Sequence, residues 1–357
     1  MQRQLAPIVE GLIYGPSYAY LNYLIRSPRP LEAEATWQAV AGRRSPFIEW
    51  ARNEWPPAFC RPWLLARKQR EDARLGIAAH YDVSNEFYEL FLDKKYMFYS
   101  CADFRSPDDT LEDAQTRKAD FIFKLIDPRP GERILELGCG WGSMLKRIYE
   151  ATGDKQNLFG YTLSREQAAY NLAHGQFNVE FQNFLTADYR PEFFDKIYSI
   201  GAWEHVRPQE EGPVLEKLFA ALKPGGRLVK HFFCRLTDRM PASAIISQIF
   251  FPGAVNSSYR FHLRNFEAAG FLPTHQSIHD YRPTLRAWFD NLVANRERAL
   301  ELVDVQTYNR YLVFFPAAWR YFDDVTGALF RFVLEKPALP ARPPASSTRE
   351  TGLAAAS

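Results

Sequence analysis

From residue 134 onward, short apolar segments alternate with amphipathic ones, and this alternation limits the possible folds more than any other feature of the sequence. The apolar segments are RILELG, NLFGYT, VEFQNF, FDKIYSIGA, RLVKHFF and LFRFVLEK, and the segments between them include SMLKRIYEAT, SREQAAYNLAHG and GPVLEKLFAAL. Strands that alternate with helices in this way indicate a parallel, doubly wound sheet. The sequence therefore predicts an α/β fold whose ligands bind at the carboxyl ends of the strands.

A glycine-rich turn follows the first of these strands, in the stretch ILELGCGWG. Gly138, Gly140 and Gly142 remove Cβ atoms where the chain passes from strand to helix, so a ligand can approach the backbone there. The dinucleotide pattern G-x-G-x-x-G, with an acid about 20 residues later, is not matched convincingly. Glu136, late in the strand, is a candidate to orient a cationic end of a ligand or the loop itself.

The regions outside the alternating pattern have distinct compositions. Residues 1–75 are rich in Trp, Arg and Pro with helix-like segments, and the spacing of Phe47, Trp50 and Ala51 predicts one buried stripe. The main domain is assigned to residues 76–335, with Thr110 as the N-cap of a helix that ends at DPRPGE.

Two segments depart from the regular pattern of the main domain. Residues from about 236 to 265 interrupt the alternation and are predicted to form an insertion or lid. Residues 336–357 are rich in Pro, Ala and Ser and are predicted to be a disordered tail.

Composition narrows the classes of partner. The net charge of +2 over 357 residues gives no whole-chain reason to expect nucleic acid. Four cysteines without CxxC spacing suggest neither a zinc cluster nor a disulfide framework, and they fit a reducing cytoplasm. Pro, Gly, Glu and Arg interrupt the N-terminal apolar residues, so we expect no signal peptide or spanning helix. A soluble or membrane-peripheral protein is expected, and the sequence does not indicate its oligomeric state.

A specific resemblance extends over about residues 75–335. The segments HYDVSNEFYELFLDKKYMFYSCADF, TLEDAQ, ILELGCGWG, GYTLSREQ, FDKIYSIGAWEHV and LKPGGRLVKHF have the order and approximate spacing found in one enzyme family. The chain resembles the cyclopropane fatty acid synthase family of S-adenosylmethionine-dependent methyltransferases. The resemblance implies a seven-stranded class I (Rossmann-like) methyltransferase fold.

The resemblance also implies which residues bind S-adenosylmethionine. Its methionine part is assigned to one aromatic segment, its backbone contacts to the glycine turn, and its ribose and adenosine to the end of the second strand. The implied residues are Tyr81, Tyr99 and Ser100 for the methionine part, Gly138 and Gly140 for the backbone contacts, and Thr162 and Gln167 for the ribose and adenosine. Glu136 joins this set from the residue pattern itself.

Attack by an alkene on a methyl donor leaves a carbocation, which has to lose a proton to a base without being quenched by water. A dry aromatic pocket with one buried base meets that need. Glu204 and His231 follow two successive strands, and Cys101 follows a Tyr-Ser pair. In the family, a Cys, a Glu, a His and a Tyr hold bicarbonate as the proton acceptor, and the matching positions are Cys101, Glu204, His231 and Tyr281.

Structural explanations stand beside these roles. Cys101 alone is typical of a buried apolar residue, Glu204 of an acid at a helix start, and His231 of a hydrogen-bonded core histidine. His80 and His205 either support loop geometry or take part in chemistry. Five aromatic residues suit the core and a cation-stabilising pocket wall equally: Phe232, Phe233, Phe250, Phe251 and Trp288.

The resemblance implies methyl transfer to the double bond of an unsaturated fatty acyl chain, in a phospholipid, with a cyclopropane or a methyl-branched product. Such an enzyme is expected in the cytoplasm, peripherally at the inner membrane face. The Arg and Trp of residues 1–75 fit either the lipid surface or a solvated helical cap that packs on the main domain. Two alternatives are N-methylation of a small amine by the same fold and a non-catalytic lipid-binding protein.

Overall fold

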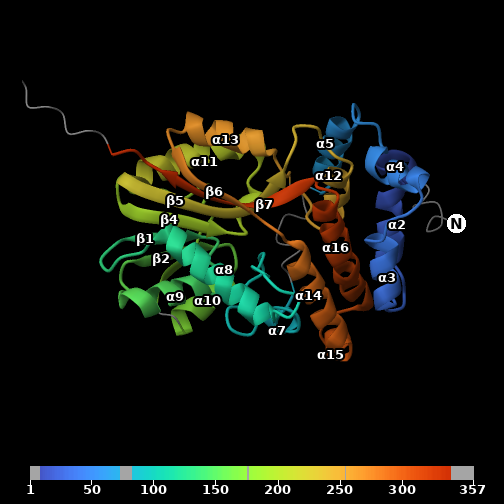
Figure 1. Ribbon diagram of the computed structural model, residues 1–357, viewed down its shortest axis with the longest axis horizontal. Coiled ribbons are helices and arrows are strands. Elements are labelled where there is room, and N and C mark those ends of the chain that lie inside the picture. Colours follow the sequence, from blue (N-terminus) through green and yellow to red (C-terminus); the bar gives the residue numbers. More distant parts are fainter. Residues whose placement is uncertain (1–8, 73–82, 175–176, 254, 339–357) are drawn as a thin grey trace, which may run out of the picture.

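A single seven-stranded sheet organises the computed structural model, which describes residues 9–72, 83–174, 177–253 and 255–338 (Figure 1). The strand order is β3-β2-β1-β4-β5-β7-β6. The strands are β1 (Ile134–Leu137), β2 (Leu158–Thr162), β3 (Asn178–Phe181), β4 (Phe194–Ile200), β5 (Leu222–Arg235), β6 (Leu272–His279) and β7 (Gly327–Glu335).

The first five strands are parallel to one another, and β7 is antiparallel to both of its neighbours, β5 and β6. Strand β1 pairs with β2 on one side and with β4 on the other, so the strand order reverses next to β1. Ligands of doubly wound sheets bind in the crevice at such a point. The predicted α/β fold is confirmed, although β6 was not predicted.

Helices cover both faces of the sheet (Figure 1). One face carries α8 (Leu111–Ile126), α9 (Ser143–Thr152) and α10 (Arg165–His174), and the other carries α11 (Pro208–Ala221) and α13 (Tyr259–Ala268). Because both faces are covered, all four residues of β1 are buried. The predicted start of α8 is confirmed, since the Asp113 backbone N–H donates to Thr110 Oγ1 over 3.1 Å.

A second group of helices packs beside the sheet. It comprises α7 (Asn85–Glu89), α12 (Ser243–Ile246), α14 (Arg282–Ala294), α15 (Arg296–Leu302) and α16 (Val305–Asp323), with the short 3₁₀ helices η1 (Trp203–His205) and η2 (Ser247–Ile249). Phe87, Phe91, Trp288, Tyr311 and Phe315 form an aromatic core between α7, α14 and α16. Helices α14–α16, which lie between β6 and β7, were not predicted from the sequence.

The N-terminal region contributes α2 (Pro16–Ile25), α3 (Ala33–Val40), α4 (Pro46–Glu54) and α5 (Arg61–Asp72). A separate apolar cluster joins it to the rest: Tyr18, Leu21 and Leu64 pack with Phe250 and Val313. The segment predicted as an insertion or lid forms α12, η2 and the beginning of α13. Residues 339–357 of the predicted tail lie outside the described residues.

The prediction of a buried stripe on α4 is wrong. Phe47 is 75% exposed and Trp50 is 54% exposed, and their rings stack on each other with centroids 6.1 Å apart. The physical reason is that the side of α4 facing the protein is polar. Glu49 pairs with Arg320 of α16, and an Arg52 guanidinium N–H donates to the Gly42 carbonyl over 3.2 Å.

Candidate active site

The three glycines of the turn after β1 all have left-handed backbone, with φ of 76°, 53° and 75° at Gly138, Gly140 and Gly142. Their surroundings differ. A Cβ on Gly138 would lie 2.6 Å from Ala202 Cβ, and a Cβ on Gly142 would lie 1.9 Å from Asn171 Oδ1. A Cβ on Gly140 would meet nothing within 4 Å, so this glycine alone of the three borders open space.

The contact between Gly138 and Ala202 brings together the loops that follow β1 and β4. After β4, Gly201 turns the chain with φ of 69° and leads into η1, which carries Glu204 and His205. A Cβ on Gly201 would lie 3.4 Å from Ser100 Cβ, so the Tyr99–Ser100 segment packs closely against this turn. Three loops therefore meet at the point where the strand order reverses.

An apolar cavity of about 160 Å³ lies beside η1. Its walls come from the ends of β4 and β5, from α12 and η2, and from α14 and α16. The aromatic side chains in the wall are Tyr99, Phe233, Phe250, Phe251, Tyr281, Trp288, Phe314, Tyr321 and Phe322. Glu204 is the one carboxylate among the described residues that line it. The cavity offers one acid in an aromatic chamber.

Glu204 is held in place by the next strand. Its Oε1 accepts the Phe233 backbone N–H over 3.2 Å, while its buried Oε2 has no hydrogen-bond partner within the described parts of the chain. Burial raises the pKa of Glu204 to about 7, because the charged form loses hydration. The carboxyl group therefore gains or loses a proton near neutral pH and has one oxygen left for a ligand.

His231 lies directly opposite Arg331 in the β5–β7 ladder. Arg331 Nε donates to His231 Nδ1 over 3.0 Å, and its two terminal nitrogens each lie 2.7 Å from a carboxylate oxygen of Asp103. Burial, and then the positive charge of Arg331, hold the pKa of His231 well below its usual value. The imidazole is therefore neutral and carries its proton on Nε2, which has no partner among the described residues.

Sequence reasoning missed Asp103 and Arg331. Burial alone raises the pKa of Asp103, but hydrogen bonds from His279 and Arg331 hold it below its usual range. The signal in the sequence is an arginine within the apolar strand LFRFVLEK, since a buried guanidinium requires an acidic partner. That signal identifies Arg331 but not its partner, which lies 228 positions away in the chain.

Cys101 and Tyr281 approach the site from two other elements. The buried Cys101 thiol lies 3.5 Å from the Asp280 carbonyl, which places it next to the residue preceding Tyr281. Burial raises the pKa of Cys101 to about 12, so the thiol is neutral. Tyr281 is the N-cap of α14 and lines the cavity with Glu204, whereas Cys101 and His231 do not line it. Both of these lie instead around the Arg331–Asp103 pair.

Helix α8 fixes the segment that precedes Cys101. Gln115 Nε2 donates to the Ser100 carbonyl over 3.0 Å, and Lys118 Nζ lies 2.9 Å from Ser100 Oγ. Burial lowers the pKa of Lys118 to about 7. Tyr99 lines the cavity, whereas Ser100 is buried against α8 and does not.

The remaining predicted cofactor residues surround the ends of β1 and β2. The Thr162 hydroxyl donates to Gln167 Oε1 over 2.7 Å, which braces the first turn of α10. Glu136 is buried within the sheet, where it accepts the Tyr198 hydroxyl over 2.9 Å, and burial raises its pKa to about 8. Tyr81 and His80 lie outside the described residues.

Four of the five aromatic residues that suited both the core and a pocket wall line the cavity, and two of these four also belong to buried apolar clusters. Phe233, Phe250, Phe251 and Trp288 line the cavity. Phe232 points to the opposite face of β5, where it is fully buried in the core under α11 and α13. His205 lines the cavity beside Glu204.

The family model described as mycolic acid cyclopropane synthetase matches residues 67–332. The chain belongs to this family. Hydroxymycolate synthase MmaA4 of Mycobacterium bovis is 34% identical to it over 269 residues, which are 70% of this chain and 88% of that protein. This member of the mycolic acid cyclopropane synthetase family is thus an S-adenosylmethionine-dependent methyltransferase, and the non-catalytic alternative is set aside.

Solved structures agree with the fold. The mycolic acid cyclopropane synthase CmaA1, complexed with SAH and CTAB, is 28% identical and has a TM-score of 0.66, over 73% of this chain and 97% of that one. Coclaurine N-methyltransferase, bound to N-methylheliamine and SAH, is 16% identical with a TM-score of 0.68, over 91% of this chain and 100% of that one. The second likeness shows the class I methyltransferase fold alone.

Gly140 gives a test of cofactor binding that separates ligand contact from backbone strain. We expect Gly140→Ala to weaken S-adenosylmethionine binding about 10-fold or more, because a methyl group would enter space that the ligand needs. Gly153→Ala is the control, since Gly153 also has left-handed backbone and open surroundings but ends α9. Titration calorimetry measures both affinities, and equal losses in the two variants would contradict the assignment.

The buried Glu204 carboxyl group predicts a pH-dependent effect on stability. A pKa raised from 4.5 to about 7 means that the folded state binds the proton more tightly, so the wild type loses stability as the pH rises through 7. Glu204→Gln removes that loss. We expect its free energy of unfolding, relative to the wild type, to increase between pH 5 and pH 8 by an amount on the order of 3 kcal/mol. Urea denaturation at both pH values measures it, and a pH-independent difference would refute the assignment.

Proposed function

We propose that this enzyme transfers a methyl group to the double bond of an unsaturated acyl chain in a phospholipid, giving a cyclopropane or methyl-branched product, with bicarbonate as the base. The observation that carries the proposal is the aromatic cavity with a single carboxylate, Glu204, whose Oε2 has no partner among the described residues. An apolar chamber suits an acyl chain, and aromatic faces stabilise a developing carbocation.

The residues present fit S-adenosylmethionine at the ends of β1 and β2. Gly140 borders open space there, and the loop carrying Tyr99 packs against the turn after β4. When bound, S-adenosylmethionine supplies an electrophilic methyl group. The chain would hold it with the Gly138–Gly140 backbone, Tyr99 and Thr162, and the acceptor alkene would occupy the aromatic cavity. Positioning of the acceptor supplies most of the rate gain for such a transfer.

The four residues assigned to bicarbonate have complementary hydrogen-bonding capacity. His231 carries an Nε2–H donor without a partner among the described residues, which suits an anion, and the neutral Cys101 thiol would not repel one. Ionised Glu204 accepts a hydrogen bond from the O–H group of bicarbonate. The two unprotonated oxygens of bicarbonate, which are the basic ones, then point away from Glu204. The proton lost from the cationic product would pass to one of those oxygens.

Amine N-methylation is a second candidate, favoured by one observation. Glu204 and His205 are adjacent in η1 and both line the cavity, an arrangement that suits removal of a proton from an ammonium group. Such a reaction needs no separate anion site. Loss of activity in bicarbonate-depleted buffer, restored by added bicarbonate, distinguishes lipid methylation from this candidate.

Expression of the wild type in cells should add one CH₂ to unsaturated phospholipid chains, detected by mass spectrometry, with NMR separating ring closure from branching. Glu204→Gln should lower turnover by about 100-fold or more while S-adenosylmethionine affinity stays within about twofold, because the base system is lost and the cofactor turn is intact. With purified enzyme, kcat/KM should rise with pH and level off above about 7, the pKa of Glu204. Wild-type lipids of unchanged mass would refute the proposed reaction.

We further propose that the enzyme works at the cytoplasmic face of the inner membrane. Exposed aromatic side chains concentrate between residues 47 and 63, where Phe59 is 87% exposed and Trp63 is 59% exposed, in addition to Phe47 and Trp50. Aromatic residues of this kind insert into the interfacial region of a bilayer. No helix of the described residues has the length and apolar character needed to cross a membrane.

The triple variant Phe47→Ser/Trp50→Ser/Phe59→Ser should bind phospholipid vesicles about 10-fold more weakly or worse, because each exposed aromatic group contributes apolar area to the bilayer contact. Leu272→Ser/Ile278→Ser is the control, since both residues are exposed on β6. Vesicle flotation measures binding. Equal binding by the triple variant and the wild type would exclude this surface as the membrane contact.

A further inference from the structure

A second, larger cavity of about 860 Å³ separates the N-terminal helices from the main domain. One wall comes from α2, from the end of α3 and from α4, and the other from residues 237–246 and the end of α16. Figure 1 shows α2–α4 beyond α16, on the side away from the sheet, and α5 above α16, next to α12. Most of the first wall precedes residue 67, where the family match begins. About half of the residues that line this cavity therefore lie outside the family match.

Positive charge dominates the lining of the second cavity. Its arginines are Arg44, Arg52, Arg61, Arg239 and Arg320, and its carboxylates are Glu54 and Asp324. Burial and then the nearby Arg320 lower the pKa of Arg52, which shows that positive groups crowd one another there. A bound anion would relieve that repulsion.

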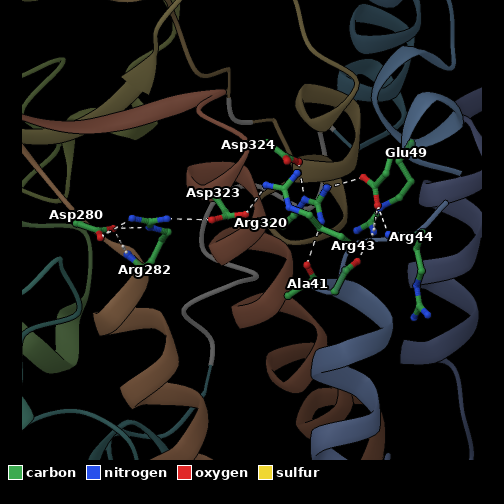
Figure 2. A network of polar contacts seen from close by, with 11 residues as sticks. Ala41, Arg43, Arg44, Glu49, Asp280, Arg282, Arg320, Asp323 and Asp324 are labelled. Carbon is green, nitrogen blue, oxygen red and sulfur yellow. Dashed lines mark hydrogen bonds and ion pairs between the residues drawn. The ribbon is translucent and has the colours of Figure 1, made fainter. Parts of the chain in front are cut away.

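Three of the five arginines are committed to structure. Arg61 donates to the carbonyls of Pro56 over 2.6 Å and Met240 over 2.9 Å, and Arg52 donates to the Gly42 carbonyl. Figure 2 shows Arg320 between Asp324, Glu49 and the Ala41 carbonyl. These contacts hold α4 and α5 around the cavity.

Arg44 and Arg239 differ from the other three because they are exposed. Arg44 reaches the Gln38 carbonyl over 3.1 Å, and Arg239 pairs with Glu54 at the surface. Replacing such exposed contacts by contacts to a ligand costs little free energy, so both guanidinium groups are available to a ligand. Each presents a planar fork of N–H donors that matches the oxygens of a phosphate.

The second cavity adjoins the aromatic cavity directly. Five residues line both: Pro241, Ser243, Ile246, Ala317 and Tyr321. Tyr321 is fixed at this boundary, since its hydroxyl accepts the Asn256 side-chain N–H over 2.7 Å. A molecule with an anionic end and an apolar end would place one in each cavity.

We propose that the second cavity binds the phosphate-bearing head group of the lipid whose acyl chain occupies the aromatic cavity, with Arg44 and Arg239 as its phosphate ligands. The proposal rests on the proposed function, because it takes the acyl chain as the methyl acceptor. It assigns to the N-terminal helices a role in selecting phospholipids over neutral lipids with the same chains.

The test compares two acceptors with identical unsaturated chains, a phosphatidylglycerol and a diacylglycerol, in micelles of one neutral detergent. We expect the wild type to methylate the phospholipid with a kcat/KM about 10-fold higher or more. Arg44→Gln/Arg239→Gln should abolish most of that preference and leave the diacylglycerol rate unchanged. Arg296→Gln/Arg298→Gln removes the same charge from α15, away from both cavities, and should retain the preference.

The alternative outcomes separate the proposals. Equal wild-type rates on the two acceptors would overturn the head-group site and leave acyl methylation standing, whereas methylation of neither would overturn both. A further experiment measures the effect of inorganic phosphate on thermal stability. A phosphate-induced rise in wild-type Tm that Arg44→Gln/Arg239→Gln lacks, without a preference between acceptors, would assign the cavity to free phosphate and overturn the head-group site.

Discussion

The site depends on the close contact between the loops that follow β1 and β4. Only a glycine at position 138 allows it, because a Cβ there would lie 2.6 Å from Ala202 Cβ. The reversal of strand order beside β1 makes these loops neighbours, and the contact sets the distance between them. The open glycine, Gly140, and the carboxylate, Glu204, each lie two residues beyond this contact. A larger residue at position 138 or 202 would separate the glycine turn from Glu204.

The buried Arg331 imposes the second constraint. A guanidinium without water is costly, and removing the partner of such a buried charge costs about 3–5 kcal/mol, so Asp103 contributes to stability as well as to geometry. The same arginine donates to His231, which determines the side of the imidazole that carries the proton. The same side chain therefore bears on stability and on the hydrogen-bonding state of His231, which is neutral and carries an Nε2–H donor.

The sequence predicted features that depend on local pattern. The strands around the glycine turn, the Thr110 cap and the placement of Glu204 after β4 all follow from periodicity and turn chemistry within short windows. The features that the sequence could not predict depend on contacts between residues that are distant in the chain. Phe47 and Trp50 have helical spacing, but only the fold shows that the polar side of α4 faces the protein. Likewise, three similar glycines proved to have different neighbours.

The N-terminal helices are tied to the site by charge as well as by apolar packing. Arg282 bridges Asp280 and Asp323 with distances of 2.9 Å to each, and Arg43 reaches Asp323 from the N-terminal side (Figure 2). Tyr281 lies between Asp280 and Arg282 in the sequence, so these ion pairs flank a residue that lines the aromatic cavity. Exposed pairs contribute little individually, but these connect the segment that carries Tyr281 to α16 through Asp323. The ion pair between Glu49 of α4 and Arg320 of α16 lies beside the second cavity, so charged contacts of α16 reach both cavities.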